Sequence, residues 1–205
     1  MRVFGMYVGV IEFLITLNTL TFILTLADET FFLLFALMPS QLFFEPWTLL
    51  TSMFTHASFN HLLFNMIALF FLGSYLERII GEKNFLRVYF IGGLGGGILT
   101  LIMAYIGLMR PDVAVVGASG AVFSVAACLA ILRPNLTIFL FPIPFPMPLY
   151  LAVFGFMLVM SFMPGIAWSG HLGGLIVGAL YGLSYKGGRK QQSTESGIRR
   201  GYRFY

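Results

Sequence analysis

Long apolar runs follow one another along most of the chain, and short polar or proline-containing gaps separate them. Each run approaches the ~20 residues that an α-helix needs to cross the hydrocarbon core of a bilayer. The pattern therefore predicts an all-α polytopic membrane protein that is built as a bundle of six transmembrane helices. The expected spans cover about residues 3–26, 60–76, 85–109, a fourth run that ends at Arg133, 149–163 and 167–185.

Residues 27–55, between the first two spans, are rich in Phe and Leu, yet acidic residues and prolines interrupt them. The stretch Thr30–Met38 is too short to span a bilayer, so we expect an amphipathic interfacial helix and a partly embedded first loop. The chain beyond Lys186 is basic and contains glycine and serine. This composition predicts a membrane domain over residues 1–186 and a disordered cytoplasmic tail over residues 187–205.

Apolar side chains make up 59% of the 205 residues and charged ones 10%, whereas a soluble domain carries about 25% charged residues. Cytoplasmic termini leave only Arg110 of the 12 Lys and Arg residues outside, as the positive-inside rule favours. The net charge of +4 therefore indicates membrane orientation rather than nucleic-acid binding. The first run ends in Thr25-Leu26-Ala27, which resembles a signal cleavage site, but it carries Glu12 and we interpret it as a retained span.

Four polar residues in the spans are expected at a similar depth. In the six-span topology the second, fourth and sixth spans run in the same direction, from the outer face to the inner one. Heights can then be counted at 1.5 Å per residue from the charged residue that closes each span. They come to about 21 Å for Ser119, 22 Å for His171, 24 Å for His61 and 18 Å for Asn65. These groups therefore share a layer in the outer half of the membrane.

Such groups are costly in contact with lipid, so they should face the interior of the bundle or a cavity. They could simply hydrogen-bond neighbouring helices, or they could form a hydrolytic site. Ser119 stands between Gly117 and Gly120 at a helix start, where unpaired N–H groups can stabilise an oxyanion. Gly174 and the glycines one turn on either side of it would let the last span approach closely, bringing His171 within reach of the Ser119 hydroxyl. We favour the hydrolytic interpretation for the set.

The motifs and their order resemble the rhomboid family of intramembrane serine proteases over about residues 1–186. The matching pieces are Gly117-Ala118-Ser119-Gly120, the spacing of His56, His61 and Asn65, and Gly170-His171-Leu172-Gly173-Gly174. Pro46-Trp47 in the first loop is a further similarity, although Thr48 follows where the family usually carries arginine.

The resemblance implies a rhomboid-like bundle that cuts a peptide bond near the outer end of a substrate's transmembrane segment. It implies that Ser119 is the nucleophile and His171 the general base. His61 and Asn65, with the Ser119 N–H, would hold the oxyanion, and His56 would be structural. Phe123 would pack under His171, and the fifth span would be a lateral gate for substrates.

Other functions remain open. A proton-coupled transporter or channel could use the intramembrane histidines as a relay, and a catalytically inactive rhomboid-like protein could bind client spans. The chain lacks the His-Glu-x-x-His motif of metalloproteases, and no acid falls in the outer half of the spans that carry the site, so we expect a Ser–His dyad without a carboxylate, metal or cofactor. The expected partners are single-span membrane proteins and the lipid bilayer. The expected location is the cell membrane, with cytoplasmic termini and a site open toward the outer face.

Overall fold

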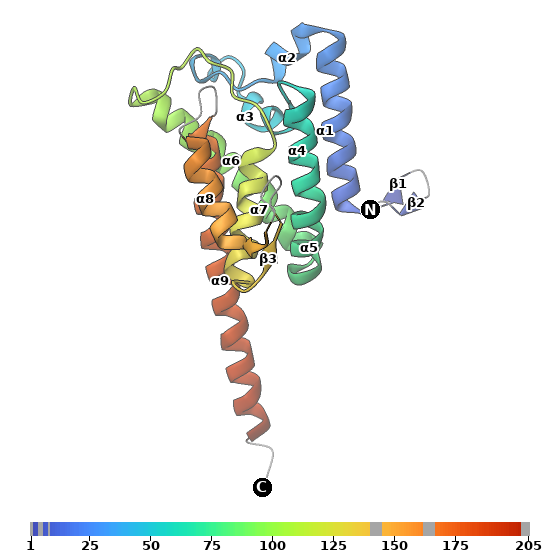
Figure 1. Cartoon of the computed structure of the whole chain (residues 1–205), viewed down its shortest axis with the longest axis vertical. Coiled ribbons are helices and arrows are strands. Elements are labelled where there is room, and N and C mark those ends of the chain that lie inside the picture. Colours follow the sequence, from blue (N-terminus) through green and yellow to red (C-terminus); the bar gives the residue numbers. More distant parts are fainter. Residues whose placement is uncertain (1, 4–5, 8, 140–144, 162–166, 202–205) are drawn as a thin grey trace.

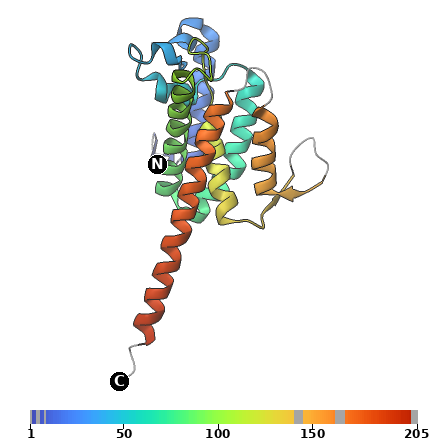
Figure 2. The ribbon, with the colours of Figure 1, turned by 90° about the vertical axis from the view of Figure 1, so that its left-hand side faces the viewer.

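A bundle of α-helices forms the body of the protein in the computed structural model, which describes residues 2–3, 6–7, 9–139, 145–161 and 167–201 (Figure 1). The longer helices lie side by side, and the first loop covers one end of the bundle. The last helix extends well beyond the other end (Figure 2). The helical elements are α1 (Val10–Ala27), α2 (Glu29–Phe35), η1 (Pro39–Gln41), α3 (Thr48–Thr51), η2 (Ser52–Phe54), α4 (Phe59–Ala68), η3 (Leu69–Gly73, a π-helical turn), α5 (Ser74–Ile80), α6 (Glu82–Tyr105), α7 (Ser119–Leu132), α8 (Leu149–Ser161) and α9 (Trp168–Gly201).

Three of these helical segments are long and apolar enough to cross a membrane: Val10–Ala27, Phe59–Ile80 and Glu82–Tyr105. This confirms the prediction of a mostly helical membrane protein. The count of six spans stays a prediction, because α7 has 14 residues and α8 has 13. At 1.5 Å per residue α7 is only about 21 Å long, which agrees with a helix that begins inside the membrane. The end expected for the fifth span lies outside the described residues.

The N-terminus differs from the predicted first span. Instead of a helix from Val3, two short strands, β1 (Arg2–Val3) and β2 (Met6–Tyr7), pair antiparallel. Gly9 has an extended backbone, with φ of −65° and ψ of 158°, and α1 begins only after it. A second pair of strands, β3 (Thr137–Ile138) and β4 (Met147–Pro148), precedes α8.

The C-terminus also differs from the expected disordered tail, because α9 continues as helix to Gly201. Seven of the 15 residues from Gly187 to Gly201 are Lys, Arg, Gln or Glu, which are good helix formers that can extend a helix already nucleated in the bundle, although four others are glycine. Composition indicated a polar segment correctly, but polarity by itself does not stop a helix. The domain boundary near residue 186 stays a prediction.

Glycines bring α6, α7 and α9 together at the centre of the bundle. A Cβ atom on Gly174 of α9 would overlap the Gly120 carbonyl of α7, and one on Gly178 would overlap the backbone of Ser124. A Cβ on Gly96 of α6 would lie 2.5 Å from the Gly170 carbonyl oxygen. Only glycine allows backbones to approach this closely. The close approach predicted from the glycine spacing on the last span is therefore confirmed.

The first loop is held by side chain to backbone hydrogen bonds. Trp47 Nε1 donates to the Leu34 carbonyl at 2.9 Å, and the Thr51 hydroxyl donates to the Phe35 carbonyl at 3.0 Å. A short helix is present in this region as α2, which has no buried residues, and its interfacial position stays a prediction. Thr48, at the position where the family usually carries arginine, is buried and donates to the Glu45 carbonyl at 2.6 Å. At Thr48 the first loop is therefore stabilised by a short hydrogen bond within the loop.

Candidate active site

The backbone before α7 is shaped by a glycine that no other residue could easily replace. Gly117 has a φ of +121°, a region that side chains with a Cβ rarely adopt. Its N–H donates to the Ser52 carbonyl at 2.9 Å, and the next N–H, of Ala118, points to His56 Nε2 at 3.4 Å. Leu37 and Val115 also form a β-bridge. These contacts from the first loop place the start of α7, so the buried His56 has the surroundings of a structural residue.

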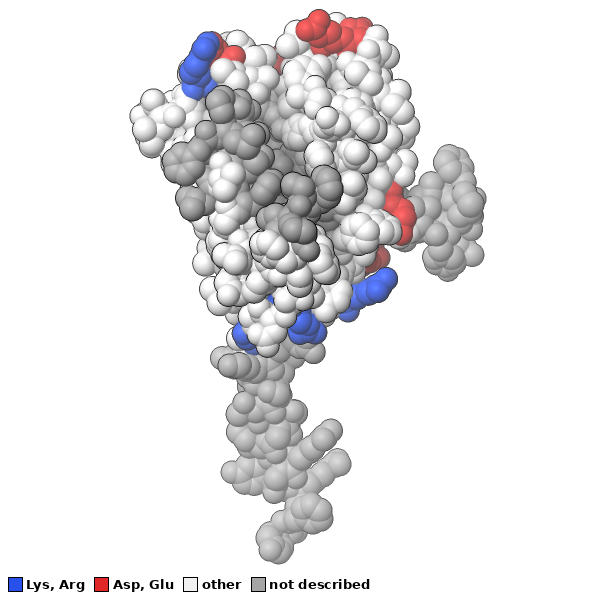
Figure 3. Space-filling view, in the orientation of Figure 1, with Lys and Arg blue, Asp and Glu red and all other residues white. Residues whose placement is uncertain are grey.

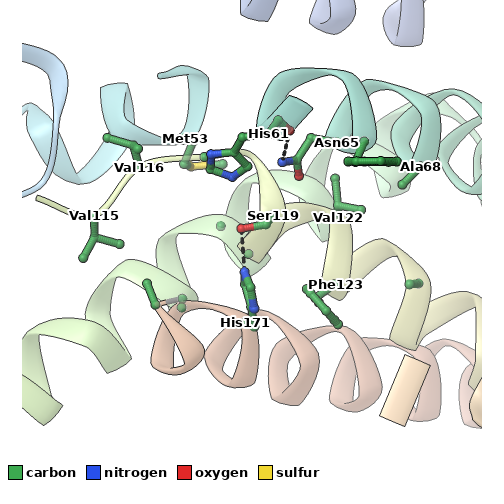
Figure 4. A pocket seen from close by; sticks show the side chains of 18 of the residues that line it. Met53, His61, Asn65, Ala68, Val115, Val116, Ser119, Val122, Phe123 and His171 are labelled. Atoms are coloured by element: carbon green, nitrogen blue, oxygen red, sulfur yellow. Dashed lines mark hydrogen bonds between the residues drawn. The ribbon is translucent and has the colours of Figure 1, made fainter. Parts of the chain in front are cut away.

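Ser119 and His171 meet across the contact between α7 and α9. His171 Nε2 lies 2.8 Å from Ser119 Oγ, a hydrogen-bond distance (Figure 4). The imidazole is only 7% exposed. Phe123, one turn after Ser119, stacks on it with ring centroids 4.6 Å apart and an interplanar angle of 28°. The predicted proximity of the two side chains and the packing of Phe123 against His171 are both confirmed.

Among the described residues no carboxylate bonds to the Nδ1 side of this imidazole. His171 Nδ1 is buried and has no hydrogen-bond partner among the residues that the structure describes. Two loop acids are engaged elsewhere: Asp112 pairs with Arg110 at 2.6 Å, and Asp28 accepts the Thr30 N–H at 2.8 Å. The bond from Arg110 lowers the pKa of Asp112, and the bond from Thr30 lowers the pKa of Asp28. Both carboxylates are exposed, whereas His171 is buried.

His61 and Asn65 lie one turn apart on α4 and face Ser119 from the side opposite His171 (Figure 4). His61 Nε2 is 2.6 Å from where a Cβ of Gly117 would stand, so the missing side chain makes room for the imidazole. Asn65 Nδ2 donates one hydrogen to the His61 carbonyl at 2.8 Å. The amide nitrogen keeps a second hydrogen. The His61 ring also contacts His56, with centroids 5.0 Å apart.

A cavity of about 540 Å³ contains this group of polar residues. Ser119, His61, Asn65 and His171 all line it. Apolar side chains from α4, η3, α7 and α8 form much of the rest of its lining, here called the apolar compartment, and include Phe64, Ala68, Leu72, Val122, Ala152 and Val153. The cavity thus combines a few polar side chains with a largely apolar lining. No group of three metal-ligating side chains gathers in the part of the chain that the structure describes.

Two contributors to the site carried no clear signal in the sequence. Ser52 and Met53 line the cavity from the first loop, and Met53 occupies the space that a side chain on Gly93 would need. A serine and a methionine in an irregular loop resemble many others, so spacing could not single them out. Thr100 and Ser169, also near the cavity, could have been identified, because buried hydroxyls in spans need partners.

The fold is thus a bundle of apolar helices, three of them long enough to cross a membrane, around a cavity in which a serine and a histidine are in contact. The profile of the Rhomboid domain matches residues 44–187. The chain belongs to the rhomboid family.

Relatives with rhomboid names occur in several organisms. The chain is 31% identical over 157 residues to rhomboid protease AarA of Providencia stuartii, covering 68% of this chain and 56% of that protein. It is 31% identical over 152 residues to the mitochondrial rhomboid protein 1 of Saccharomyces cerevisiae, covering 66% and 40%. It is 35% identical over 136 residues to rhomboid protease GluP of Bacillus subtilis, covering 65% and 25%. The matches thus span about half or less of these relatives' lengths.

Proposed function

We propose that this protein is an intramembrane serine endopeptidase, with Ser119 as nucleophile and His171 as general base. The observation that carries the proposal is the 2.8 Å contact between His171 Nε2 and Ser119 Oγ in a cavity among apolar helices. A nucleophile within hydrogen-bond reach of its base is the arrangement that covalent catalysis requires. The names of two relatives, rhomboid protease AarA and rhomboid protease GluP, agree with this assignment.

The chemistry follows from the two nitrogens of the imidazole. For Nε2 to accept the serine proton, the neutral ring must carry its hydrogen on Nδ1. Ser119 Oγ attacks the substrate carbonyl carbon while its proton passes to Nε2. The tetrahedral intermediate collapses when the C–N bond breaks, and His171 returns the proton to the leaving amine. Water, deprotonated by the same nitrogen, then adds to the acyl-enzyme and releases Ser119.

The oxyanion would be held between α4 and the start of α7. Ser119 is the first residue of α7, so its N–H has no partner within the helix. His61 Nε2 and the remaining hydrogen of Asn65 Nδ2 face the same space across Gly117 and Ser119. Three donors from two elements match the demand for preorganised groups where negative charge develops. Gly120 and Gly174 serve this site by keeping α7 and α9 close together.

The apolar compartment suggests the substrate. A space lined by Ala, Val, Leu and Phe suits a stretch of a single-span membrane protein rather than a polar peptide. The helical peptide bonds of such a span are shielded, so the segment must unwind before Ser119 can attack. Residues of low helix propensity near the cut, glycine above all, would lower that cost. We therefore propose cleavage near the outer end of a substrate span, with entry past α8.

The orientation rests on charge. On the face shown in Figure 3, most of the visible cations lie at the end from which α9 emerges, close to an acid, whereas the first-loop end shows several acids and one cation. By the positive-inside rule the end with most of the cations is cytoplasmic. We propose that both termini are cytoplasmic and that Ser119 lies toward the outer face of a cell membrane.

Cleavage in reconstituted vesicles tests the function. Purified protein is mixed into liposomes with a single-span substrate, and the fragments are mapped by mass spectrometry. We expect cuts near the outer end of the span with the wild type and none with Ser119→Ala or His171→Ala. Cleavage by purified, folded Ser119→Ala would refute the serine mechanism. An intact substrate with the wild type, together with histidine-dependent proton flux, would favour the transporter. An intact substrate that still binds would favour the inactive client-binding protein.

A further inference from the structure

Two buried hydroxyls join α6 to α9 just before His171. The Oγ1 of Thr100 on α6 and the Oγ of Ser169 on α9 are 2.9 Å apart, and both residues are 0% exposed. Ser169 Oγ also lies 2.8 Å from Met109 Sδ, and Thr100 Oγ1 lies 3.1 Å from the Gly96 carbonyl oxygen. Both hydroxyl hydrogens can therefore be used, for example from Thr100 to Ser169 and from Ser169 to the Met109 sulfur.

The location of this pair in α9 links it to His171. Ser169 is the second residue of α9 and His171 the fourth, so both belong to its first turn. A first turn lacks the backbone bonds that hold the middle of a helix. The Gly170 carbonyl between them is pressed against α6 and α7, where Cβ atoms on Gly96 and Gly120 would lie 2.5 Å and 3.1 Å from it. The glycine contacts set how closely this turn of α9 approaches α6 and α7. Glycines have no side chains that could interlock, so these contacts do little to prevent the turn from rotating about the helix axis.

Apart from its contact with the nucleophile, the imidazole has no hydrogen bond to a described residue that would fix its orientation. Its Nε2 contacts the nucleophile, its Nδ1 has no partner among the described residues, and Phe123 packs against one ring face. In proteases with a triad a carboxylate holds the corresponding nitrogen. Here the orientation of the ring must come largely from the backbone that carries it. The hydroxyl pair is a directional contact between that backbone and α6, two residues before His171.

We propose that Ser169 and Thr100 are positioning residues for His171, acting through the first turn of α9. This proposal rests on the proposed protease function. By bonding to α6 the pair fixes the rotation of that turn, which keeps Nε2 at hydrogen-bond distance from Ser119 Oγ. Without it the turn can rotate, and the imidazole reaches its productive position for a smaller fraction of the time.

Conservative variants test the pair. Ser169→Ala and Thr100→Val each remove one hydroxyl with little change in volume, and Thr100→Ser keeps the hydroxyl while removing a methyl group. Ser124→Ala is the matched control: Ser124 is also buried, and its hydroxyl donates to the Val88 carbonyl of α6 at 2.9 Å, but it lies on α7 away from His171. All four are purified in detergent and assayed with the wild type for kcat, KM and Tm.

We expect Ser169→Ala and Thr100→Val to lower kcat about tenfold to a hundredfold, because a displacement of about 1 Å can cost that much. Their KM should stay within about twofold of the wild type, since uniform binding is not affected. Thr100→Ser should restore kcat to near the wild-type value. Ser124→Ala should lower Tm as much as Ser169→Ala does and leave kcat unchanged.

Contrary outcomes are distinct. If Ser169→Ala and Ser124→Ala lower Tm equally and both leave kcat unchanged, the pair is only structural and the proposal fails. It also fails if Thr100→Ser is as slow as Thr100→Val, because the methyl group and not the hydroxyl would then matter. If Ser169→Ala does not fold, Thr100→Val with Thr100→Ser decides alone. Failure of the wild type itself to cleave would instead refute the proposed protease function.

Discussion

Replacing Gly174 by alanine should separate the two helices that carry the dyad. The new Cβ would stand 2.7 Å from the Gly120 carbonyl carbon and 3.1 Å from its Cα, and closer still to the oxygen. Nonbonded carbon atoms need ~3.5 Å or more, so α7 and α9 must move apart by about 1 Å. That movement carries the Ser119–His171 contact from 2.8 Å to about 3.8 Å, beyond hydrogen-bond range.

The expected cost has two parts. Overpacking of this kind destabilises a protein by about 1–3 kcal/mol, and a 1 Å error at the dyad lowers kcat about a hundredfold. Liposome cleavage and thermal unfolding measure the two separately. Gly182→Ala, two turns further along α9, is the matched control: its Cβ would come no closer than 3.0 Å to Ile131. The reasoning is refuted if Gly174→Ala folds and cleaves at the wild-type rate, or if Gly182→Ala is equally slow.

Three further predictions concern the surroundings of the dyad. Asn65→Ala should lower kcat roughly tenfold to a thousandfold, as loss of one oxyanion donor does; an unchanged kcat would remove Asn65 from the oxyanion site. Burial lowers the pKa of His56 from 6.5 to about 3, so the unfolded chain binds the proton first and stability falls as pH drops below about 6.5. Tm measured from pH 7 to 4.5 should therefore fall more steeply in the wild type than in His56→Ala, and parallel curves would contradict this. Asp28→Asn and Asp112→Asn should each leave cleavage within about a few-fold, whereas loss of activity in a folded variant would reveal a hidden carboxylate partner.

The pairing of Ser119 with His171 could be predicted from the sequence, because the few polar residues inside apolar spans indicate where a site lies. In apolar spans each hydroxyl or imidazole needs a partner, and helical rise converts sequence position into depth. Ser119 and His171 were matched in depth by this reasoning, and the glycines of the last span explained how they meet. The start of α7 could also be predicted from the sequence, because the chain before it contains Gly117 and no helical run.

Irregular backbone could not be anticipated in the same way. The π-helical turn at Leu69–Gly73 lies within an uninterrupted apolar run, where periodicity does not separate a π turn from an α-helix. The β1–β2 pairing and the contacts of the first loop with Gly117 depend on neighbours distant in sequence. Those neighbours determine the conformation of His61 and of the oxyanion region. This side of the site could therefore be described only from the structure.

Chemical labelling of the nucleophile tests the central claim most directly. Purified protein in detergent is treated with a fluorophosphonate, digested, and the modified peptide is mapped by mass spectrometry. An activated serine reacts only when its base is in place. The account predicts one adduct, on Ser119, that is absent from Ser119→Ala and strongly reduced in His171→Ala. An adduct on another serine that tracks cleavage activity, or equal labelling of Ser119 without His171, would contradict it.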